Sequence, residues 1–145
     1  MLEAIFEAKK SLEEGGIPIG SVLVKDNQIV GRGHNRRVQK GSAILHAEMD
    51  ALESVGRQPA SFYEDVIIYT TLSPCSMCTG AILLYKIRHV VVGENKTFLG
   101  DEALLQERGV KVEVLDDETC FQLMQDFILK NRSLWSEDIG TSLTS

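Results

Sequence analysis

Two short segments of the sequence hold the residues whose types and spacing could do chemistry. One residue separates His46 from Glu48, and two residues separate Cys75 from Cys78. Imidazole nitrogen and cysteine thiolate are common zinc ligands, and a catalytic zinc site keeps one of its four positions free for water. His46, Cys75 and Cys78 are therefore predicted to hold one zinc ion through three protein ligands.

The position of Glu48 predicts the role of a proton carrier. The two cysteines lie three residues apart, so at the start of a helix they share a face, and a helix N-terminus favours thiolate over thiol. Glu48 follows the histidine by two residues and can reach water at the metal. Zinc acidifies such water, and a neighbouring carboxylate can accept its proton and return it to a substrate. We predict that Glu48 is the catalytic group.

The cysteine pair has two other interpretations, a redox pair and part of a structural zinc site. A redox pair would leave His46 and Glu48 unexplained, and a structural zinc site would need a fourth protein ligand. Only Cys120, His34 and His89 remain for that place. Cys120 falls in a helical pattern and is expected to pack as a small apolar residue, while His89 falls in an apolar strand pattern. The catalytic interpretation is favoured.

The elements that must position these residues follow from periodicity and breakers. The order of helices and strands predicts a single α/β domain over residues 1–145, with helices on both faces of a sheet of about five strands. Residues 31–41 are expected to be a polar loop, and Ser42 to cap the helix after it. The expected helices are 2–14, a segment from Ser42 carrying Leu45, Met49 and Leu52, 75–85, 102–108 and 118–130, and the expected strands are 21–24, 28–30, 65–70, 88–92 and 110–115.

Composition sets the class of protein. The chain has 145 residues, of which 43% are hydrophobic and 25% are charged, as in ordinary soluble domains. Its three cysteines are too few for a disulfide framework and indicate a reducing compartment. The acidic, helical N-terminus is unlike a signal peptide, and no apolar run approaches the roughly 20 residues that span a bilayer. We expect a cytoplasmic protein without membrane contact.

The charge balance argues against nucleic acid as a partner. The formal net charge is −6, whereas proteins that hold a phosphate backbone usually have a basic face. Arg32, Arg36, Arg37 and Lys40 form one local basic cluster. We interpret this cluster as a solvated loop near a small-molecule site.

The motifs resemble those of a known family. His-x-Glu followed by Pro-Cys-x-x-Cys is typical of zinc deaminases that act on nucleobases. The sequence resembles the cytidine deaminase superfamily and, within it, the fungal-type cytosine deaminases. The further stretches that carry this resemblance are residues 15–20, 31–35, 39–43, 69–75, 78–82, 92–95 and 135–140.

The resemblance implies a fold and an activity. The implied fold is a three-layer α-β-α sandwich with a mixed five-stranded sheet, and the implied assembly is a homodimer with one zinc ion per chain. The implied reaction is hydrolytic deamination of a free nucleobase, cytosine to uracil and ammonia, by zinc-activated water with Glu48 as the proton shuttle.

The resemblance also implies a substrate pocket. Asn35 would hold the N1/O2 edge of a pyrimidine, although Asn is also a common turn former. Phe98 would pack on the ring, and Trp135 with Asp138 would close the pocket, although Trp135 could simply anchor the C-terminus. The remaining expected contacts are the Ala47 N–H, the Ser73 carbonyl and Ile19.

Three alternatives stay open. Another free base, such as guanine, isocytosine or a modified pyrimidine, could occupy the same pocket. A tRNA adenosine deaminase would share the motifs, but it must hold an anticodon loop, which the acidic balance disfavours. The Trp135–Gly140 tail favours a free pyrimidine. A non-catalytic zinc-stabilised interaction domain would have no use for Glu48.

Overall fold

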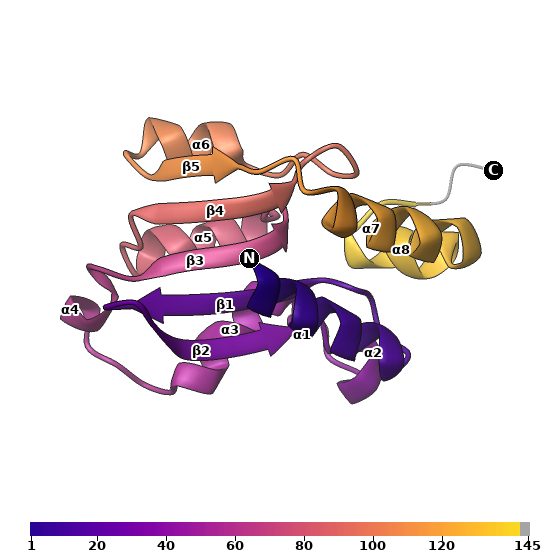
Figure 1. Ribbon diagram of the computed structural model, residues 1–145, viewed down its shortest axis with the longest axis horizontal. Helices are drawn as coiled ribbons and strands as arrows, with labels where there is room; N and C mark the ends of the chain where they lie inside the picture. Colours follow the sequence, from indigo (N-terminus) through magenta and orange to yellow (C-terminus); the bar gives the residue numbers. More distant parts are fainter. Residues whose placement is uncertain (143–145) are drawn as a thin grey trace.

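The computed structural model describes residues 1–142, which form a mixed five-stranded sheet in the order β2-β1-β3-β4-β5 (Figure 1). β1 is antiparallel to both β2 and β3, whereas β3, β4 and β5 run parallel. The predicted mixed sheet is confirmed. The strands are β1 (Gly20–Lys25), β2 (Gln28–His34), β3 (Ile67–Leu72), β4 (His89–Glu94) and β5 (Lys111–Val114).

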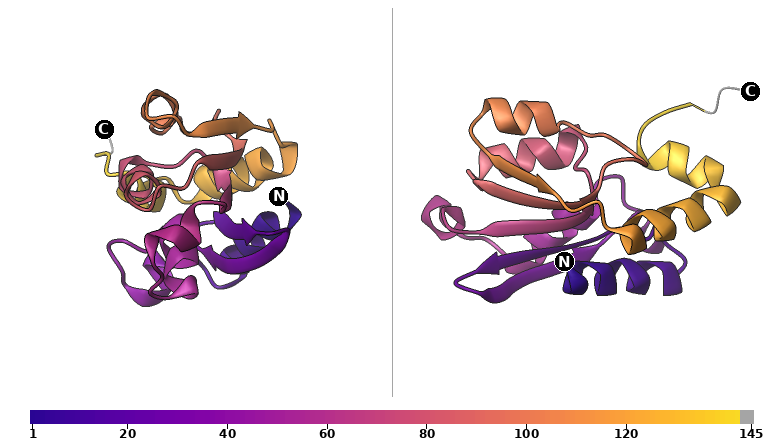
Figure 2. Two further views of the ribbon diagram at one scale, coloured as in Figure 1. Left: turned by 90° about the vertical axis from the view of Figure 1, so that its left-hand side faces the viewer. Right: turned by 45° about the horizontal axis from the view of Figure 1, so that its top comes forward.

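Helices cover both faces of the sheet, so the predicted three-layer α-β-α arrangement is also confirmed. α1 packs on β1 and β2, and α7 lies on the same side against β4, while α3 and α5 cover the opposite face (Figures 1 and 2). The helices are α1 (Leu2–Glu13), α2 (Arg37–Lys40), α3 (Ala47–Val55), α4 (Ala60–Tyr63), α5 (Ser76–Leu84), α6 (Glu102–Glu107), α7 (Glu118–Lys130) and α8 (Arg132–Asp138).

The buried apolar residues form two clusters with different roles. The larger cluster fills the space between the sheet and α3, α5 and α6, and includes Leu23, Ile68 and Ile82, none of which is exposed. The smaller cluster lies at one end of the sheet and joins Leu72 on β3 to Trp135 on α8. This second cluster ties the C-terminal helices to the sheet, and it borders the site described below.

Glycines allow α1 and α3 to pack closely on the outer strands. A Cβ at Gly20 would collide with the Ala4 carbonyl of α1. A Cβ at Gly33 would collide with the Ala51 backbone and come within 2.6 Å of the Asp50 carbonyl carbon of α3. These contacts explain why a glycine-punctuated stretch can belong to a strand.

The prediction of a loop over residues 31–41 is therefore wrong in two places. β2 continues through Gly33 to His34, which pairs with Gly20, because the missing Cβ atoms admit α3. Residues Arg37–Lys40 then form the short helix α2.

The start of α3 also differs from the prediction. The Ser42 hydroxyl does not cap a helix but accepts the backbone N–H groups of Ile44 and Leu45 within a turn. α3 begins at Ala47, with His46 as its N-cap residue. The strand predicted to end at residue 92 runs on to Glu94, and the sequence pattern predicted neither α4 nor α8.

Within residues 1–142, no helix is both long and apolar enough to cross a membrane. The single domain predicted over residues 1–145 stays a prediction, and residues 143–145 lie outside the described part of the chain.

We expect Gly33→Ala to lower the free energy of unfolding by about 1–3 kcal/mol, because the added methyl group overpacks the contact between β2 and α3. Gly80→Ala is the control, since a Cβ at that position of α5 meets nothing within 4 Å. That substitution should raise stability by about 0.5–1 kcal/mol, as expected for glycine in a helix interior. Urea unfolding of both variants checks the pair, and equal effects would contradict the packing argument.

Candidate active site

Several strands bring their site residues to one edge of the sheet. β2, β3 and β4 all end there, and the antiparallel β1 begins there. Asn35 follows β2, Ser73 follows β3, and Ile19 precedes β1. In α/β proteins, ligands bind outside the carboxyl ends of strands, where the topology changes. Here the change is at β3, which is antiparallel to β1 and parallel to β4.

The predicted metal ligands meet at this edge because two helices begin there. His46 is the N-cap residue of α3, Cys75 is the N-cap residue of α5, and Cys78 lies in the first turn of α5. The His46 Nδ1 atom is 3.3 Å from Cys75 Sγ and 3.8 Å from Cys78 Sγ, and all three donor atoms lie within 4.8 Å of one another. Tetrahedral zinc with usual bond lengths separates such ligand atoms by about 3.5–3.8 Å. The three residues therefore fit a zinc ion.

The surroundings of Cys75 favour its thiolate form, which is the form that binds metal. Hydrogen bonds from Cys78 and His46 lower the pKa of the Cys75 thiol to about 4, against the effect of burial. Burial by itself would lower the pKa of His46, but the hydrogen bond to Cys75 and the charges of Asp138 and Glu48 raise it to about 9. The shift at Cys75 therefore favours ligation. The neighbouring Cys75 and burial raise the pKa of Cys78, so Cys78 and His46 must release their protons when metal binds.

Glu48 lies beside the cluster and is almost completely buried, at 4% exposure. The Thr70 hydroxyl donates to Glu48 Oε1 at 2.7 Å, and the Cys78 thiol donates to Oε2 at 3.2 Å. Burial raises the pKa of the Glu48 carboxyl. A carboxyl group that holds its proton more tightly than usual is suited to carrying protons near neutral pH. Sequence reasoning missed Thr70, whose position facing the site becomes visible only with the register of β3.

A small cavity opens beside these groups. It brings together two of the three predicted metal ligands, Glu48 and six of the seven predicted substrate-contact residues. Leu72 and Ile139 complete its wall and were not predicted. The lining residues are Ile19, His46, Ala47, Glu48, Leu72, Ser73, Cys75, Phe98, Trp135, Asp138 and Ile139.

Asn35, the seventh predicted contact, connects to the cavity wall through Asp138. Its side chain is fully buried, and its Nδ2 donates to Asp138 Oδ1 at 2.9 Å. Its Oδ1 accepts the backbone N–H of Arg37 at 3.1 Å, which is the hydrogen bond of an Asx turn. Asn35 thus has the local turn role as well as a place next to the site.

The Ser73 side chain holds the loop that carries Phe98 in place. The Ser73 hydroxyl donates to Glu102 at 2.7 Å and accepts the Gly100 N–H at 2.9 Å. Phe98 meets Trp135 edge to face, with ring centroids 6.2 Å apart and an interplanar angle of 87°. The two aromatic rings therefore form one apolar wall, although they come from segments far apart in the sequence.

The other candidate ligands have different surroundings. His34 is fully buried between Glu7, at 2.7 Å from Nδ1, and Glu14, at 2.9 Å from Nε2. Cys120 is buried in the first turn of α7, and His89 begins β4. Among the described residues, the three-ligand set is thus formed by the histidine and two cysteines of the motifs.

Residues 1–94 match the sequence pattern of the cytidine and deoxycytidylate deaminase zinc-binding region. The chain belongs to this family. It is a zinc-dependent hydrolytic deaminase, as the motifs predicted.

Two relatives show how far the similarity extends. The chain is 59% identical to a cytosine deaminase of Candida albicans over 138 residues, which cover 94% of this chain and 92% of the relative. It is also 41% identical to a tRNA-specific adenosine deaminase of Streptococcus pyogenes over 142 residues, which cover 91% of this chain and 89% of the relative. The family therefore includes similar chains with different named substrates.

Solved structures with the same fold include one from a study of A-to-I editing by tRNA:A34 deaminases. It has a TM-score of 0.69 and 27% identity, and the match covers 83% of this chain and 94% of that chain. A guanine deaminase from Nitrosomonas europaea has a TM-score of 0.67 at 20% identity, covering 86% and 80% of the two chains. The second likeness concerns the fold alone.

We expect about one zinc ion per chain, and its loss in Cys75→Ala and Cys78→Ala, because two ligands cannot replace three at the cluster. Cys120→Ala is the matched control, since it removes a buried thiol that lies outside the three-ligand set. Elemental analysis of purified protein measures the metal. Wild-type protein that is active without metal, or equal zinc content in all three variants, would contradict the ligand assignment.

Proposed function

We propose that this chain hydrolyses free cytosine to uracil and ammonia. The observation that carries the proposal is one small cavity that is lined by the zinc ligands His46 and Cys75, by Glu48 and by Asp138. The cavity is narrow and lined on several sides, which suits a single ring better than a larger substrate. The similarity to the Candida albicans cytosine deaminase supports the choice of base.

Polar groups at the cavity wall match the edges of a pyrimidine. The buried Asp138 carboxylate accepts the N1–H of a free base, and the Ala47 N–H donates to the neighbouring carbonyl. Asn35 supports this edge of the base through its hydrogen bond to Asp138. The Ser73 carbonyl accepts a hydrogen bond from the exocyclic amine. Phe98 and Trp135 supply apolar contact to the ring, and a nucleoside would present a sugar where the free base has its N1–H.

The metal site and Glu48 divide the chemistry between them. When bound by His46, Cys75 and Cys78, zinc supplies Lewis-acid activation of the attacking water. Glu48 accepts a proton from that water and delivers it to ring N3 as the oxygen adds to C4. Glu48 then moves the second proton to the amine, the C4–N bond breaks, and uracil and ammonia leave. Thr70 holds the Glu48 carboxyl in place for both transfers.

A tRNA adenosine substrate is the second candidate, because of the Streptococcus pyogenes relative. The basic cluster argues against it, since its arginines are used within the chain. Arg32 pairs with two carboxylates of α1, Arg36 with Asp50 at 3.1 Å, and Arg37 with Asp138 at 3.4 Å. Arginines engaged in this way are less available to phosphate groups, so a small free base is favoured over nucleic acid.

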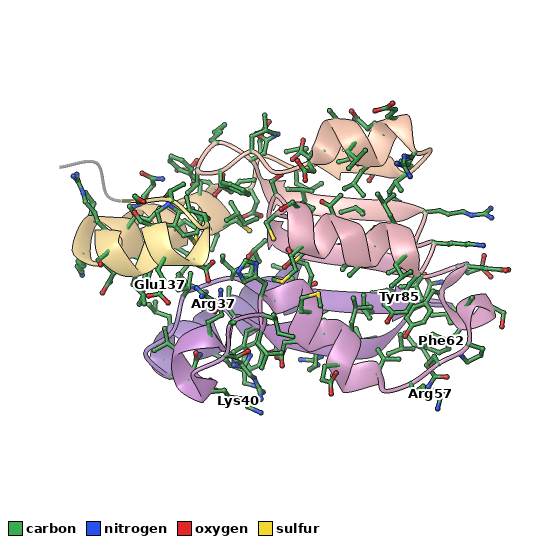
Figure 3. The ribbon with its side chains drawn as sticks, turned by 180° about the vertical axis from the view of Figure 1, so that it is seen from behind. Arg37, Lys40, Arg57, Phe62, Tyr85 and Glu137 are labelled. Atoms are coloured by element: carbon green, nitrogen blue, oxygen red, sulfur yellow. The ribbon has the colours of Figure 1, made fainter. Side chains whose placement is uncertain are left out.

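We also propose that the chain is a cytoplasmic homodimer. The three cysteines are free thiols, which suits a reducing compartment. The C-terminal part of α5 offers apolar side chains for contact with a second copy. Ile82 is buried in the core, but Leu84 is 71% exposed. Tyr85, directly after α5, lies near Phe62 (Figure 3).

A panel of free bases with ammonia detection tests the activity. We expect cytosine to react and adenine, guanine and cytidine to react at least about a hundredfold more slowly. Glu48→Gln should retain zinc and fold but lose at least about 10⁴-fold in kcat, the upper end for one acid–base group, because Glu48 serves two transfers. Activity of the variant within tenfold of wild type would assign the proton transfers elsewhere, and release of ammonia only from another base would replace cytosine.

For the assembly, sedimentation velocity at micromolar concentration should show a dimer. Leu84→Glu should shift the population to monomer, because a charge would be buried in the interface. Leu2→Glu is a matched control, since Leu2 is 82% exposed at the start of α1. A fully active wild-type monomer would refute the dimer.

A further inference from the structure

We propose that Arg37 is a positioning residue that latches α8 over the cavity and holds the Asn35–Asp138 pair in its binding geometry. Arg37 begins α2, two residues after Asn35, and it pairs with Glu137 and Asp138 of α8, 100 and 101 positions away in the chain (Figure 3). The inference deepens the proposed function and rests on it for the identity of the base.

One residue fixes both members of the pair. The backbone N–H of Arg37 donates to Asn35 Oδ1 at 3.1 Å, and its Nη1 donates to Asp138 Oδ1 at 3.4 Å. Its Nε also donates to the Ala43 carbonyl at 3.2 Å, which fixes the plane of the guanidinium group. Asn35 Nδ2 closes the loop of contacts by donating to the same Asp138 oxygen.

The contacts to Asp138 leave one carboxylate oxygen for a ligand. Asn35 Nδ2 and Arg37 Nη1 both donate to Oδ1, and His46 Nε2 lies 3.5 Å from the same atom. Since Asp138 lines the cavity, Oδ2 is the oxygen that we assign to the N–H of the base. Arg37 therefore sets which oxygen faces the ligand and where it lies.

The two carboxylate partners of Arg37 differ in burial, and this difference shows which contact is the stronger one. The Asp138 side chain is 2% exposed and that of Arg37 is 15% exposed, whereas Glu137, the second partner at 3.5 Å, is 67% exposed. Exposed ion pairs contribute little because water screens them, while a hydrogen bond to a buried charged group contributes more. The contact between Arg37 and Asp138 is therefore the one that positions α8.

The contact between Arg37 and Asp138 also holds in place the apolar wall that Phe98 and Trp135 form. Trp135 lies three residues before Asp138 on α8, so the two side chains share a face of this seven-residue helix. A helix this short depends on tertiary contacts for its stability. Fixing Asp138 therefore also holds Trp135 against Phe98, and releasing it would let α8 open for entry of the base and exit of the product.

The test compares Arg37→Gln with Lys40→Gln, which removes the same charge from the same short helix. We expect Arg37→Gln to raise KM for cytosine and the Kd for uracil, measured by calorimetry, by about 10–100-fold, the loss expected for one charge-assisted hydrogen bond. Its kcat should stay within about threefold, because Glu48 and the zinc ligands are not touched. Lys40→Gln should match wild type.

A second measurement does not depend on turnover. Trp135 is the only tryptophan of the chain, so quenching of its fluorescence by acrylamide reports the opening of α8. Quenching should increase in Arg37→Gln and to an intermediate degree in Arg37→Lys, which keeps the charge but not the planar fork. Zinc content should remain that of wild type.

The outcomes separate the latch from the activity. If Arg37→Gln has the same quenching and uracil affinity as Lys40→Gln, Arg37 does not hold α8 over the cavity. Loss of zinc together with loss of kcat in Arg37→Gln would also overturn the proposal, because it would show a merely structural role. If Arg37→Gln does not fold, Arg37→Lys decides by the same two readouts. Wild-type protein that leaves cytosine unchanged would overturn the proposed function, while the quenching comparison would still decide the latch.

Discussion

The close approach of one imidazole and two thiols at the edge of the sheet is the interaction on which the rest of the structure depends. It exists because α3 and α5 both begin at that edge, so that His46 and Cys75 occupy N-cap positions and Cys78 lies one turn further on. α3 packs this close to β2 because Gly31 and Gly33 lack side chains. The metal site is thus a consequence of how two helices pack on the sheet.

The cavity depends on a second constraint, which joins distant parts of the chain. Asn35 follows β2, and Asp138 ends α8, yet their side chains are hydrogen bonded at 2.9 Å. The Ser73 hydroxyl donates a hydrogen bond to Glu102 and accepts one from the Gly100 N–H, which belongs to the loop that carries Phe98. Each wall of the cavity is therefore held by residues that do not themselves line it, which explains how short loops and a C-terminal helix can form a defined pocket.

The sequence predicted the chemistry better than the local geometry. Residue types and spacing were sufficient for His46, Cys75 and Cys78, because metal ligation restricts both strongly. The strand at residues 31–34 was missed because glycine normally weakens strands, and only the packing of α3 explains it. Arg37, Thr70 and Glu102 act through contacts between distant elements, and no local pattern reveals such partners. The helix at Trp135 was missed because tertiary contacts rather than propensity stabilise a helix of seven residues.

A metal site with three protein ligands keeps one position open to water. X-ray absorption at the zinc edge of the purified protein measures this directly. We predict two sulfur ligands at about 2.3 Å and two nitrogen or oxygen ligands at about 2.0–2.1 Å, one of them from imidazole and one exchangeable. Addition of a base that binds in the cavity should change the light-atom shell and leave both sulfurs in place. A first shell made of four protein ligands, unchanged by any base, would show a structural zinc site and contradict the account.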